Sequence, residues 1–188
     1  MSKSSVKLYD STLRDGAQTK GVNFSLDDKF KIYKLLSDIG VDYIEGGWPG
    51  ANPTDDNFFK KVSHQSKSKL VAFGMMRKSG KSANNDPGLN AVLNSGVSSV
   101  CLVGKTWDFH VKNALKVSYT ENLDMISDSI SHASKRVDEV MFDAEHFFDG
   151  FKNNKKYSID TIKRALQSGA KWIILCDTNG GTLPYELP

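Results

Sequence analysis

The sequence predicts an α/β protein of the (β/α)8 barrel class (a TIM barrel), truncated to about six βα units. Short apolar runs typical of strands alternate with amphipathic segments typical of helices, which indicates a parallel sheet with right-handed crossovers. The first strand starts near residue 6 and the sixth near residue 171, so one unit takes roughly 33 residues and eight would need about 260, the usual size of such a barrel. Nearly every strand ends in polar or glycine-rich sequence. A closed barrel brings all these ends to one mouth, whereas an open doubly wound sheet, the alternative, gathers its chemistry at one switch point.

Start and stop signals define the elements in order. Ser25 is the expected N-cap of the first helix, with acids in the first turn, and Gly40 ends that helix. Ser118 and Glu121 have the spacing of a capping box before the clearest amphipathic helix. The expected strands are 6–10, 41–45, 70–74, 98–103, 137–144 and 171–176; the expected helices are 25–40, 55–65, 86–94, 118–137 and 158–167, with another beginning at Thr182.

Composition narrows the class of protein. The chain has 188 residues, enough for one domain with a core, and a net charge of +3 from scattered lysines, which argues against nucleic-acid binding. No apolar run is long enough to span a bilayer and the N-terminus lacks a signal-peptide core, so we expect no membrane contact and a cytoplasmic protein. Cys101 and Cys176 each lie inside an apolar strand-like run and are expected to be buried free thiols.

The number of strands predicts a fragment. Six strands are expected and the sequence ends at Pro188, which would leave apolar edges on the first and sixth strands without partners. We therefore expect residues 1–188 to be the N-terminal part of a longer barrel protein, with strands seven and eight and any regulatory domain absent.

The stretch from Leu8 to Gln18 follows the first strand and concentrates polar groups. Arg14 and Asp15 are adjacent, so they fit a turn, where Gly16 supplies backbone freedom. The carboxylate can bind a hard cation, and the guanidinium can stabilise an anion bound to that cation. The alternative is a polar turn with a surface ion pair.

Two carboxylates near the end of the fifth strand form a second candidate site. Asp143 and Glu145 alternate, so both point the same way, which in an apolar barrel strand is the lumen. There they would raise each other's pKa unless a cation or an arginine intervenes; the alternative is a pair of rim carboxylates in water. Glu45, at the end of the second strand, has the same ambiguity, and a structural role is favoured.

Other strand ends offer weaker candidates. Thr178 follows the sixth strand and can donate a hydrogen bond to a substrate carboxylate, although its segment could be a simple helix-entry turn. The histidines show no close metal-ligand spacing. His110 and His146 follow strand ends and could reach the mouth, whereas His64 and His132 are expected on helix surfaces.

Together these segments resemble a known family. The stretch Asp10-Ser-Thr-Leu-Arg-Asp-Gly16 resembles the D-x-T-L-R-D-G signature of the metal-dependent barrel enzymes that include isopropylmalate, homocitrate and citramalate synthases and hydroxymethylglutaryl-CoA lyase. The first motif marks this superfamily, and the later motifs together resemble its (R)-citramalate synthase branch over essentially the whole chain. These are Glu45-Gly-Gly-Trp-Pro-Gly50, Gly104-Lys-Thr-Trp-Asp108, Asp143-Ala-Glu-His-Phe-Phe-Asp-Gly150 and Asp177-Thr-Asn-Gly-Gly-Thr-Leu-Pro184.

The resemblance implies a Claisen-type condensation of acetyl-CoA with pyruvate, giving citramalate and CoA on a route toward isoleucine. It implies that Asp15 is a ligand of a divalent cation (Mg²⁺, Mn²⁺ or Zn²⁺) and that Arg14 stabilises the developing alkoxide. Glu145 would assist proton transfer from the acetyl methyl group, with Asp143 nearby at the substrate. Thr178 would bind the substrate carboxylate and Gln18 would help to hold the loop over it. The full-length protein is expected to be a homodimer.

Several alternatives remain open. The family's other metal ligands form an H-x-H pair on the seventh strand, and this sequence contains none, so the piece alone is expected to be inactive. Met75 and Val103 could limit the 2-oxo acid to a methyl side chain, but one methylene discriminates by only about 1–3 kcal/mol, so an isopropylmalate synthase using 2-oxoisovalerate is an alternative. A lyase or aldolase of the same fold is another. The non-enzyme alternative is an inactive truncated barrel that binds a partner or persists as a scaffold.

Overall fold

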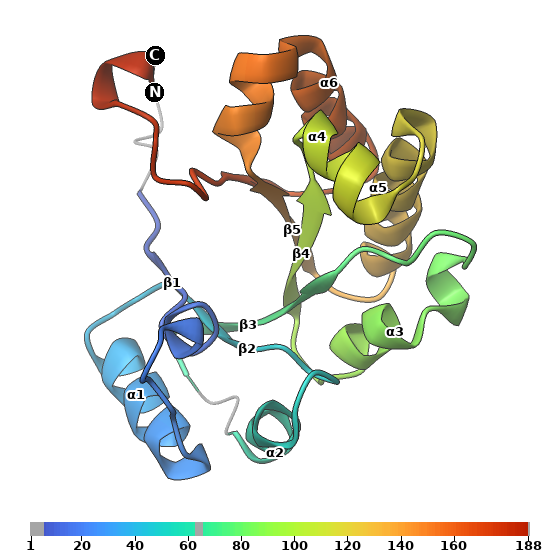
Figure 1. Ribbon diagram of the computed structural model, residues 1–188. Coiled ribbons are helices and arrows are strands. Elements are labelled where there is room, and N and C mark those ends of the chain that lie inside the picture. The colour runs from blue at the N-terminus through green and yellow to red at the C-terminus, as the bar shows by residue number, and fades with distance from the viewer. Residues whose placement is uncertain (1–5, 63–65, 188) are drawn as a thin grey trace, which may run out of the picture.

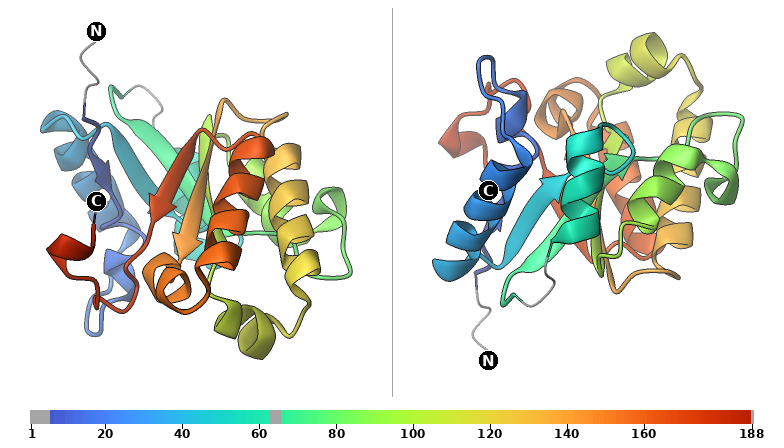
Figure 2. Two further views of the ribbon diagram at one scale, coloured as in Figure 1. Left: turned by 90° about the horizontal axis from the view of Figure 1, so that it is seen from above. Right: turned by 90° about the horizontal axis from the view of Figure 1, so that it is seen from below.

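The computed structural model describes residues 6–62 and 66–187, and the expected helical positions 63–65, including His64, lie outside the described residues. Six parallel strands form one curved sheet in the order β1-β2-β3-β4-β5-β6, and helices lie on its outer side (Figures 1 and 2). The strands are β1 (Tyr9–Asp10), β2 (Tyr43–Gly47), β3 (Lys69–Met75), β4 (Ser99–Lys105), β5 (Glu139–Glu145) and β6 (Trp172–Leu175). This arrangement confirms the predicted TIM-barrel fold, truncated to about six βα units.

Each strand is followed by helical structure. The helices are α1 (Leu26–Asp38), α2 (Pro53–Lys61), α3 (Pro87–Leu93), the single turn α4 (Asp108–His110), α5 (Tyr119–Ala133) and α6 (Phe147–Gln167), with short helical turns at Gly16–Gln18, Ala83–Asn85, Val111–Leu115 and Pro184–Glu186. None of the helices in the described ranges combines the length and apolar character needed to cross a membrane.

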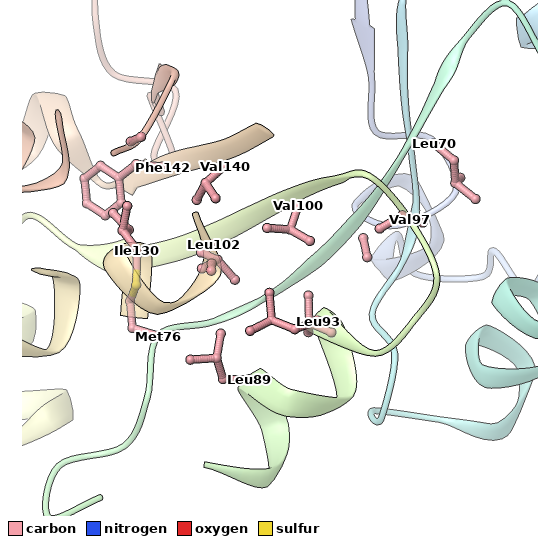
Figure 3. Close-up of a cluster of buried hydrophobic side chains, with 14 of the residues drawn as sticks. Leu70, Met76, Leu89, Leu93, Val97, Val100, Leu102, Ile130, Val140 and Phe142 are labelled. Atoms are coloured by element: carbon pink, nitrogen blue, oxygen red, sulfur yellow. The ribbon is translucent and has the colours of Figure 1, made fainter. Parts of the chain in front are cut away.

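The central strands are buried on both faces, as expected of a parallel sheet covered by helices. The outward side chains of β3, β4 and β5 pack against α3 and α5, and Figure 3 shows Leu89, Ile130 and Phe142 in this layer. The inward side chains form a second, smaller cluster around Val71, Phe73, Cys101, Val103 and Met141. This second cluster is the floor of the barrel lumen, and the polar groups of the candidate site lie at its edge.

The helix starts confirm one prediction and correct another. Ser25 caps α1 as predicted, and Asp28 completes a reciprocal capping box there. Only one of the two hydrogen bonds of the capping box predicted at Ser118 forms: the Ser118 hydroxyl accepts from the Glu121 backbone N–H. The second is absent, because the Glu121 carboxylate lies 3.1 Å from Arg77 Nη1 and does not accept from the Ser118 backbone N–H. A side chain already paired with a cation is no longer available for capping.

The helix predicted at 158–167 begins earlier, at Phe147, and bends where Asn154 leaves the helical conformation (φ −142°). Asn154 Oδ1 accepts from the Tyr157 N–H, while its Nδ2 donates to Asp108. Asn154 therefore caps the second half of α6, which is the part that periodicity detected. At the C-terminal end, the helix expected from Thr182 is only a short turn at Pro184–Glu186.

The two cysteines are free, as predicted, but only Cys101 is fully buried. Cys176 lies just beyond the end of β6 and is half-buried.

Candidate active site

Arg14 lies at the centre of the site and is held from three sides. Its Nε donates to Glu45 at 2.6 Å and its Nη1 to Asp15 at 3.1 Å. The guanidinium carbon lies 3.9 Å from the centre of the Phe73 ring, in the position of a cation–π contact. Guanidinium has five N–H donors in a fixed plane, so these contacts fix its orientation and leave Nη2 without a partner among the described residues. The arrangement presents a fixed positive charge at the mouth.

Glu45 is completely buried beneath this guanidinium. Its second oxygen accepts from the Tyr9 hydroxyl at 2.7 Å. Burial raises the pKa of Glu45, while the Arg14 charge and the Tyr9 hydrogen bond act in the opposite direction. The sequence favoured a structural role for Glu45, and the structure shows that it directly supports Arg14.

Asp143 points into the lumen from β5 and is 8% exposed. The Cys176 thiol donates to its Oδ1 at 2.8 Å, across to the neighbouring strand end. Burial raises the pKa of Asp143; the Cys176 hydrogen bond and the Arg14 charge lower it, and the charge of Glu145 raises it further. Asp143 and Glu145 alternate along β5, so their side chains leave the same face of the strand, as expected from the sequence.

Glu145 lies higher on the rim than Asp143 and is half-buried. Its carboxylate forms an ion pair with Lys105, the residue beside it on β4. The Thr106 hydroxyl donates to the Glu145 carbonyl at 2.6 Å, so the strand end is fixed as well as the side chain. Lys105 was not identified from the sequence, because a lysine at a strand end carries no distinctive signal.

Asp15 is the candidate metal ligand, and its side chain is 64% exposed beside Arg14. Across residues 6–62 and 66–187, no group of three or more His, Cys, Asp or Glu side chains is arranged to hold a metal ion. One carboxylate does not fix the geometry that a divalent cation requires. The residues described here therefore do not form a metal centre by themselves.

Two cavities open at this edge of the sheet. The smaller, about 370 Å³, is lined by Arg14 and Gln18. The larger, about 550 Å³ and mainly apolar, lies over the end of β3 and is lined by Met75. Trp48 forms part of the wall of both, and its ring packs edge-on against Phe73. Val103, the register partner of Met75, is buried in the lumen floor.

The loop that carries Trp48 is fixed by a buried ion pair. Lys29 of α1 is bonded to Asp55 of α2, and both side chains are nearly inaccessible. Asp55 also accepts from the Trp48 backbone N–H at 2.8 Å. A β-carbon at Gly47 would lie 2.6 Å from the Asp55 carboxyl carbon, so the close approach requires glycine. The pair was not predicted, because Lys29 and Asp55 are 26 residues apart.

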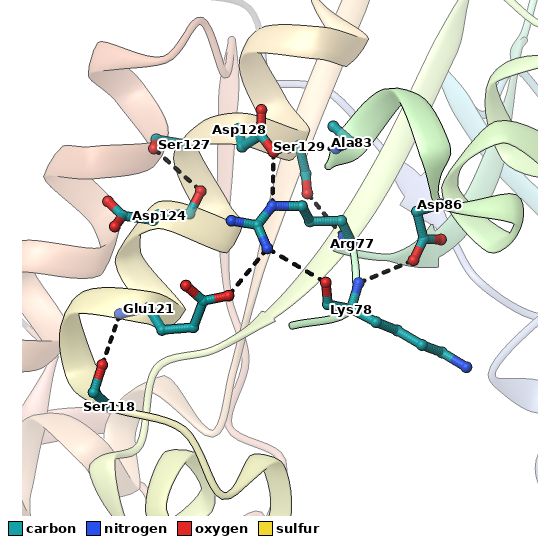
Figure 4. A network of polar contacts seen from close by, with 10 residues as sticks. All are labelled: Arg77, Lys78, Ala83, Asp86, Ser118, Glu121, Asp124, Ser127, Asp128 and Ser129. Carbon is teal, nitrogen blue, oxygen red and sulfur yellow. Dashed lines mark hydrogen bonds and ion pairs between the residues drawn. The ribbon is translucent and has the colours of Figure 1, made fainter. Parts of the chain in front are cut away.

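A second polar network fixes the far wall of the larger cavity (Figure 4). Arg77 follows β3, and its Nε donates to Asp128 at 2.7 Å while its backbone N–H donates to the Ser129 hydroxyl. Lys78 donates its backbone N–H to Asp86, which caps α3. These bonds join the end of β3 to α3 and α5, so the cavity lies between three anchored elements.

The tip of β6 is bonded to the tip of β5. Thr178 is exposed, and its hydroxyl accepts from the backbone N–H of His146 at 2.9 Å. His146 Nδ1 lies 2.9 Å from Asp149, and its ring meets that of His110 at 4.5 Å between centres. Burial and the neighbouring His146 lower the pKa of His110. The two rings therefore pack together beside the end of β5, and the described ranges contain no group of three or more such side chains arranged to hold a metal.

The comparison with known protein families gives one match over the whole barrel segment. A family model described as HMGL-like matches residues 5–187. The chain is 49% identical to an (R)-citramalate synthase of Aquifex aeolicus and 47% identical to one of Sulfolobus acidocaldarius, over 97% of this chain in each case. It is 29% identical to a 2-isopropylmalate synthase of Sulfurisphaera tokodaii. The chain spans about a third (35%) of the length of the two citramalate synthases.

Solved structures agree on the fold. An HMG-CoA lyase of Bacillus subtilis superposes with a TM-score of 0.77 at 19% identity, covering 96% of this chain and 61% of the lyase. An HMG-CoA lyase of Pseudomonas aeruginosa gives 0.74 at 20% identity, over 94% of this chain and 59% of the lyase. At this identity the likeness establishes the barrel architecture.

Proposed function

The chain belongs to the HMGL-like family, and from that membership we propose that residues 1–188 are the N-terminal part of a larger acyltransferase. The proposed reaction joins acetyl-CoA to pyruvate and, with one water, releases (R)-citramalate and free CoA, a step toward isoleucine. The observation that carries the proposal is the 49% identity to a citramalate synthase, against 29% to an isopropylmalate synthase.

In this proposal Arg14 stabilises the negative charge that develops on the keto oxygen of pyruvate. Its fixed orientation over Phe73 and its partnership with Glu45 support this role, because a preorganised donor loses little freedom when charge develops. A bound divalent cation would polarise the same oxygen; Asp15 would supply one of its ligands, and the rest would come from residues outside this sequence.

Glu145 is proposed to take the proton from the acetyl methyl group, and its ion pair with Lys105 keeps it oriented. Thr178 is proposed to bind the substrate carboxylate. Asp143 lies deeper in the lumen, and its negative charge favours the charged form of Arg14. Gln18 lines the smaller cavity and is proposed to hold the loop over the substrate. Met75, which lines the larger apolar cavity, and its register partner Val103 are proposed to limit the side chain of the 2-oxo acid to a methyl group.

The experiment is a substrate screen of the longer protein, following CoA-thiol release. Release with acetyl-CoA and pyruvate supports the proposal, whereas a preference for 2-oxoisovalerate supports the isopropylmalate synthase alternative. Cleavage of a hydroxyacyl substrate to pyruvate or acetoacetate would instead support a lyase of the same fold. Assembly as a homodimer is part of the proposal and is checked by light scattering.

A further inference from the structure

The Thr178 hydroxyl has one engaged lone pair and an uncommitted proton. It accepts the His146 backbone N–H at 2.9 Å, and it makes no other hydrogen bond within the described ranges. A threonine hydroxyl carries one donor and two acceptor positions. Because the incoming N–H occupies an acceptor position, the hydroxyl proton remains available for another acceptor, such as a carboxylate.

His146 can deliver that N–H because its backbone is in an unusual conformation. Its φ of 53° and ψ of 36° lie in the left-handed region, where residues other than glycine are uncommon. Its imidazole Nδ1 is held 2.9 Å from Asp149, and the ring packs against His110 and Trp107. The next residue, Phe147, donates its N–H to the Cys176 carbonyl at 3.1 Å. The turn after β5 is therefore attached to the tip of β6 at two points.

We propose that His146 is a positioning residue for Thr178: the Asp149–imidazole contact holds the left-handed turn, and the turn orients the threonine hydroxyl toward the carboxylate of a 2-oxo acid. The inference rests on the proposed function and extends it, since nothing in the chemistry of the reaction requires a histidine at this place. It does not involve proton transfer by the imidazole.

The test is a double-mutant cycle in the longer protein, with the pyruvate Kd measured by calorimetry and the pyruvate KM by CoA release. Thr178→Val should raise both about tenfold, the effect of losing one hydrogen bond to a charged group. His146→Ala, which disfavours the left-handed turn and removes the Asp149 contact, should raise them about threefold to tenfold, with a smaller change in kcat. In the Thr178→Val background, His146→Ala should raise the pyruvate Kd and KM by less than about twofold, because the hydroxyl that His146 positions is already absent.

Two further variants distinguish the loss of Thr178 positioning from a general loss of structure around His146. His146→Asn should restore the pyruvate Kd to within about twofold of the wild type, because asparagine tolerates the left-handed region and its amide can bond to Asp149. Lys116→Ala removes the side chain of the other described non-glycine residue with positive φ (57°), adds no backbone strain because both residues carry a β-carbon, and should leave the pyruvate Kd unchanged. If His146→Ala does not fold, Asp149→Ala takes its place in the cycle, since it removes the contact and leaves the backbone residue intact.

The inference is wrong if His146→Ala weakens pyruvate binding by the same factor with and without the Thr178 hydroxyl, or leaves binding unchanged. It is also wrong if the wild-type protein does not bind pyruvate. A protein that binds pyruvate but forms no citramalate would refute the proposed reaction, while the cycle measured on Kd would still decide the role of His146.

Discussion

Arg14 Nε lies 2.6 Å from a carboxylate oxygen of Glu45, whose side chain is 1% exposed. Glu45→Ala would leave the guanidinium partly buried without its main charge partner. We expect the free energy of unfolding in urea to fall by about 3–5 kcal/mol, the usual cost of breaking a buried pair. Tyr9→Phe removes only the hydrogen bond from an uncharged hydroxyl to the same carboxylate and should cost about 1.5–3 kcal/mol. Equal losses for the two variants would contradict the central role assigned to the pair.

Asp15→Ala should separate function from stability. Because the side chain is 64% exposed, we expect the free energy of unfolding to change by less than about 0.5 kcal/mol. Cation-dependent CoA release by the longer protein should fall at least ~100-fold, more than changes outside a metal's own ligands usually produce. Asp160→Ala, at a carboxylate on α6 paired with Lys156, is the control and should leave turnover unchanged. Retained activity in Asp15→Ala would exclude it as a ligand.

The 188-residue chain by itself should not turn over acetyl-CoA and pyruvate, with or without added Mg²⁺, Mn²⁺ or Zn²⁺. Its described residues bring together no set of three metal-ligating side chains, and one carboxylate binds such ions weakly. Thiol release is the measurement, with the longer protein as the positive control. Turnover by the chain at the rate of the longer protein would show that the site is complete without further ligands.

Gly47→Ala should destabilise the protein more than Gly80→Ala does. Both glycines have positive φ (144° and 76°), so alanine is strained at each, by about 1–2 kcal/mol. At Gly80 a β-carbon would meet nothing within 4 Å, whereas at Gly47 it would lie 2.6 Å from the Asp55 carboxyl carbon. The collision should add about 1–3 kcal/mol. Thermal unfolding measures the loss of stability in each variant. Equal losses would mean that the Trp48 loop can move away from Asp55 without cost.

Asp108→Asn should give a pH-dependent loss of stability. Burial acts to raise the pKa of Asp108, but hydrogen bonds from Asn154, Asn153 and Tyr119 outweigh it, and the pKa lies below the ordinary value of 3.8. A lowered carboxyl pKa stabilises the folded state above pH 3.8, and this contribution is lost as the pH falls through the folded-state pKa. The variant should therefore be less stable by about 1.5–3 kcal/mol at neutral pH.

The difference in the free energy of unfolding between the Asp108→Asn variant and the wild type should become smaller below pH 3.8. Urea unfolding at several pH values is the measurement, and a gap that stays constant down to the lowest pH would contradict this account. Glu186→Gln, at an exposed residue, is a control whose stability should follow that of the wild type at neutral pH.

The strand order and the position of the motifs could be predicted because they depend on local signals. Periodic apolar residues fix the elements, and parallel strands place their carboxyl ends at one edge. The contact of Arg14 with Glu45 could not be predicted, because 31 residues separate them and either could have faced solvent. The start of α6 was missed for a related reason: its first half is held by Asp108, a partner from another loop.

The roles of Arg14, Asp15, Glu145 and Thr178 came from family resemblance, and they stay predictions. The structure adds partners that pattern reading did not identify: Lys105 beside Glu145, and His146 beside Thr178. Neither pair has a characteristic spacing in the sequence, since each joins two different strand ends. Such contacts become visible only when the sheet is assembled.

Trp48 is shared by the walls of both cavities, and its ring packs edge-on against Phe73, over which the Arg14 guanidinium lies. A smaller side chain at this position would therefore alter the walls of both cavities at once and remove a neighbour of the ring beneath Arg14.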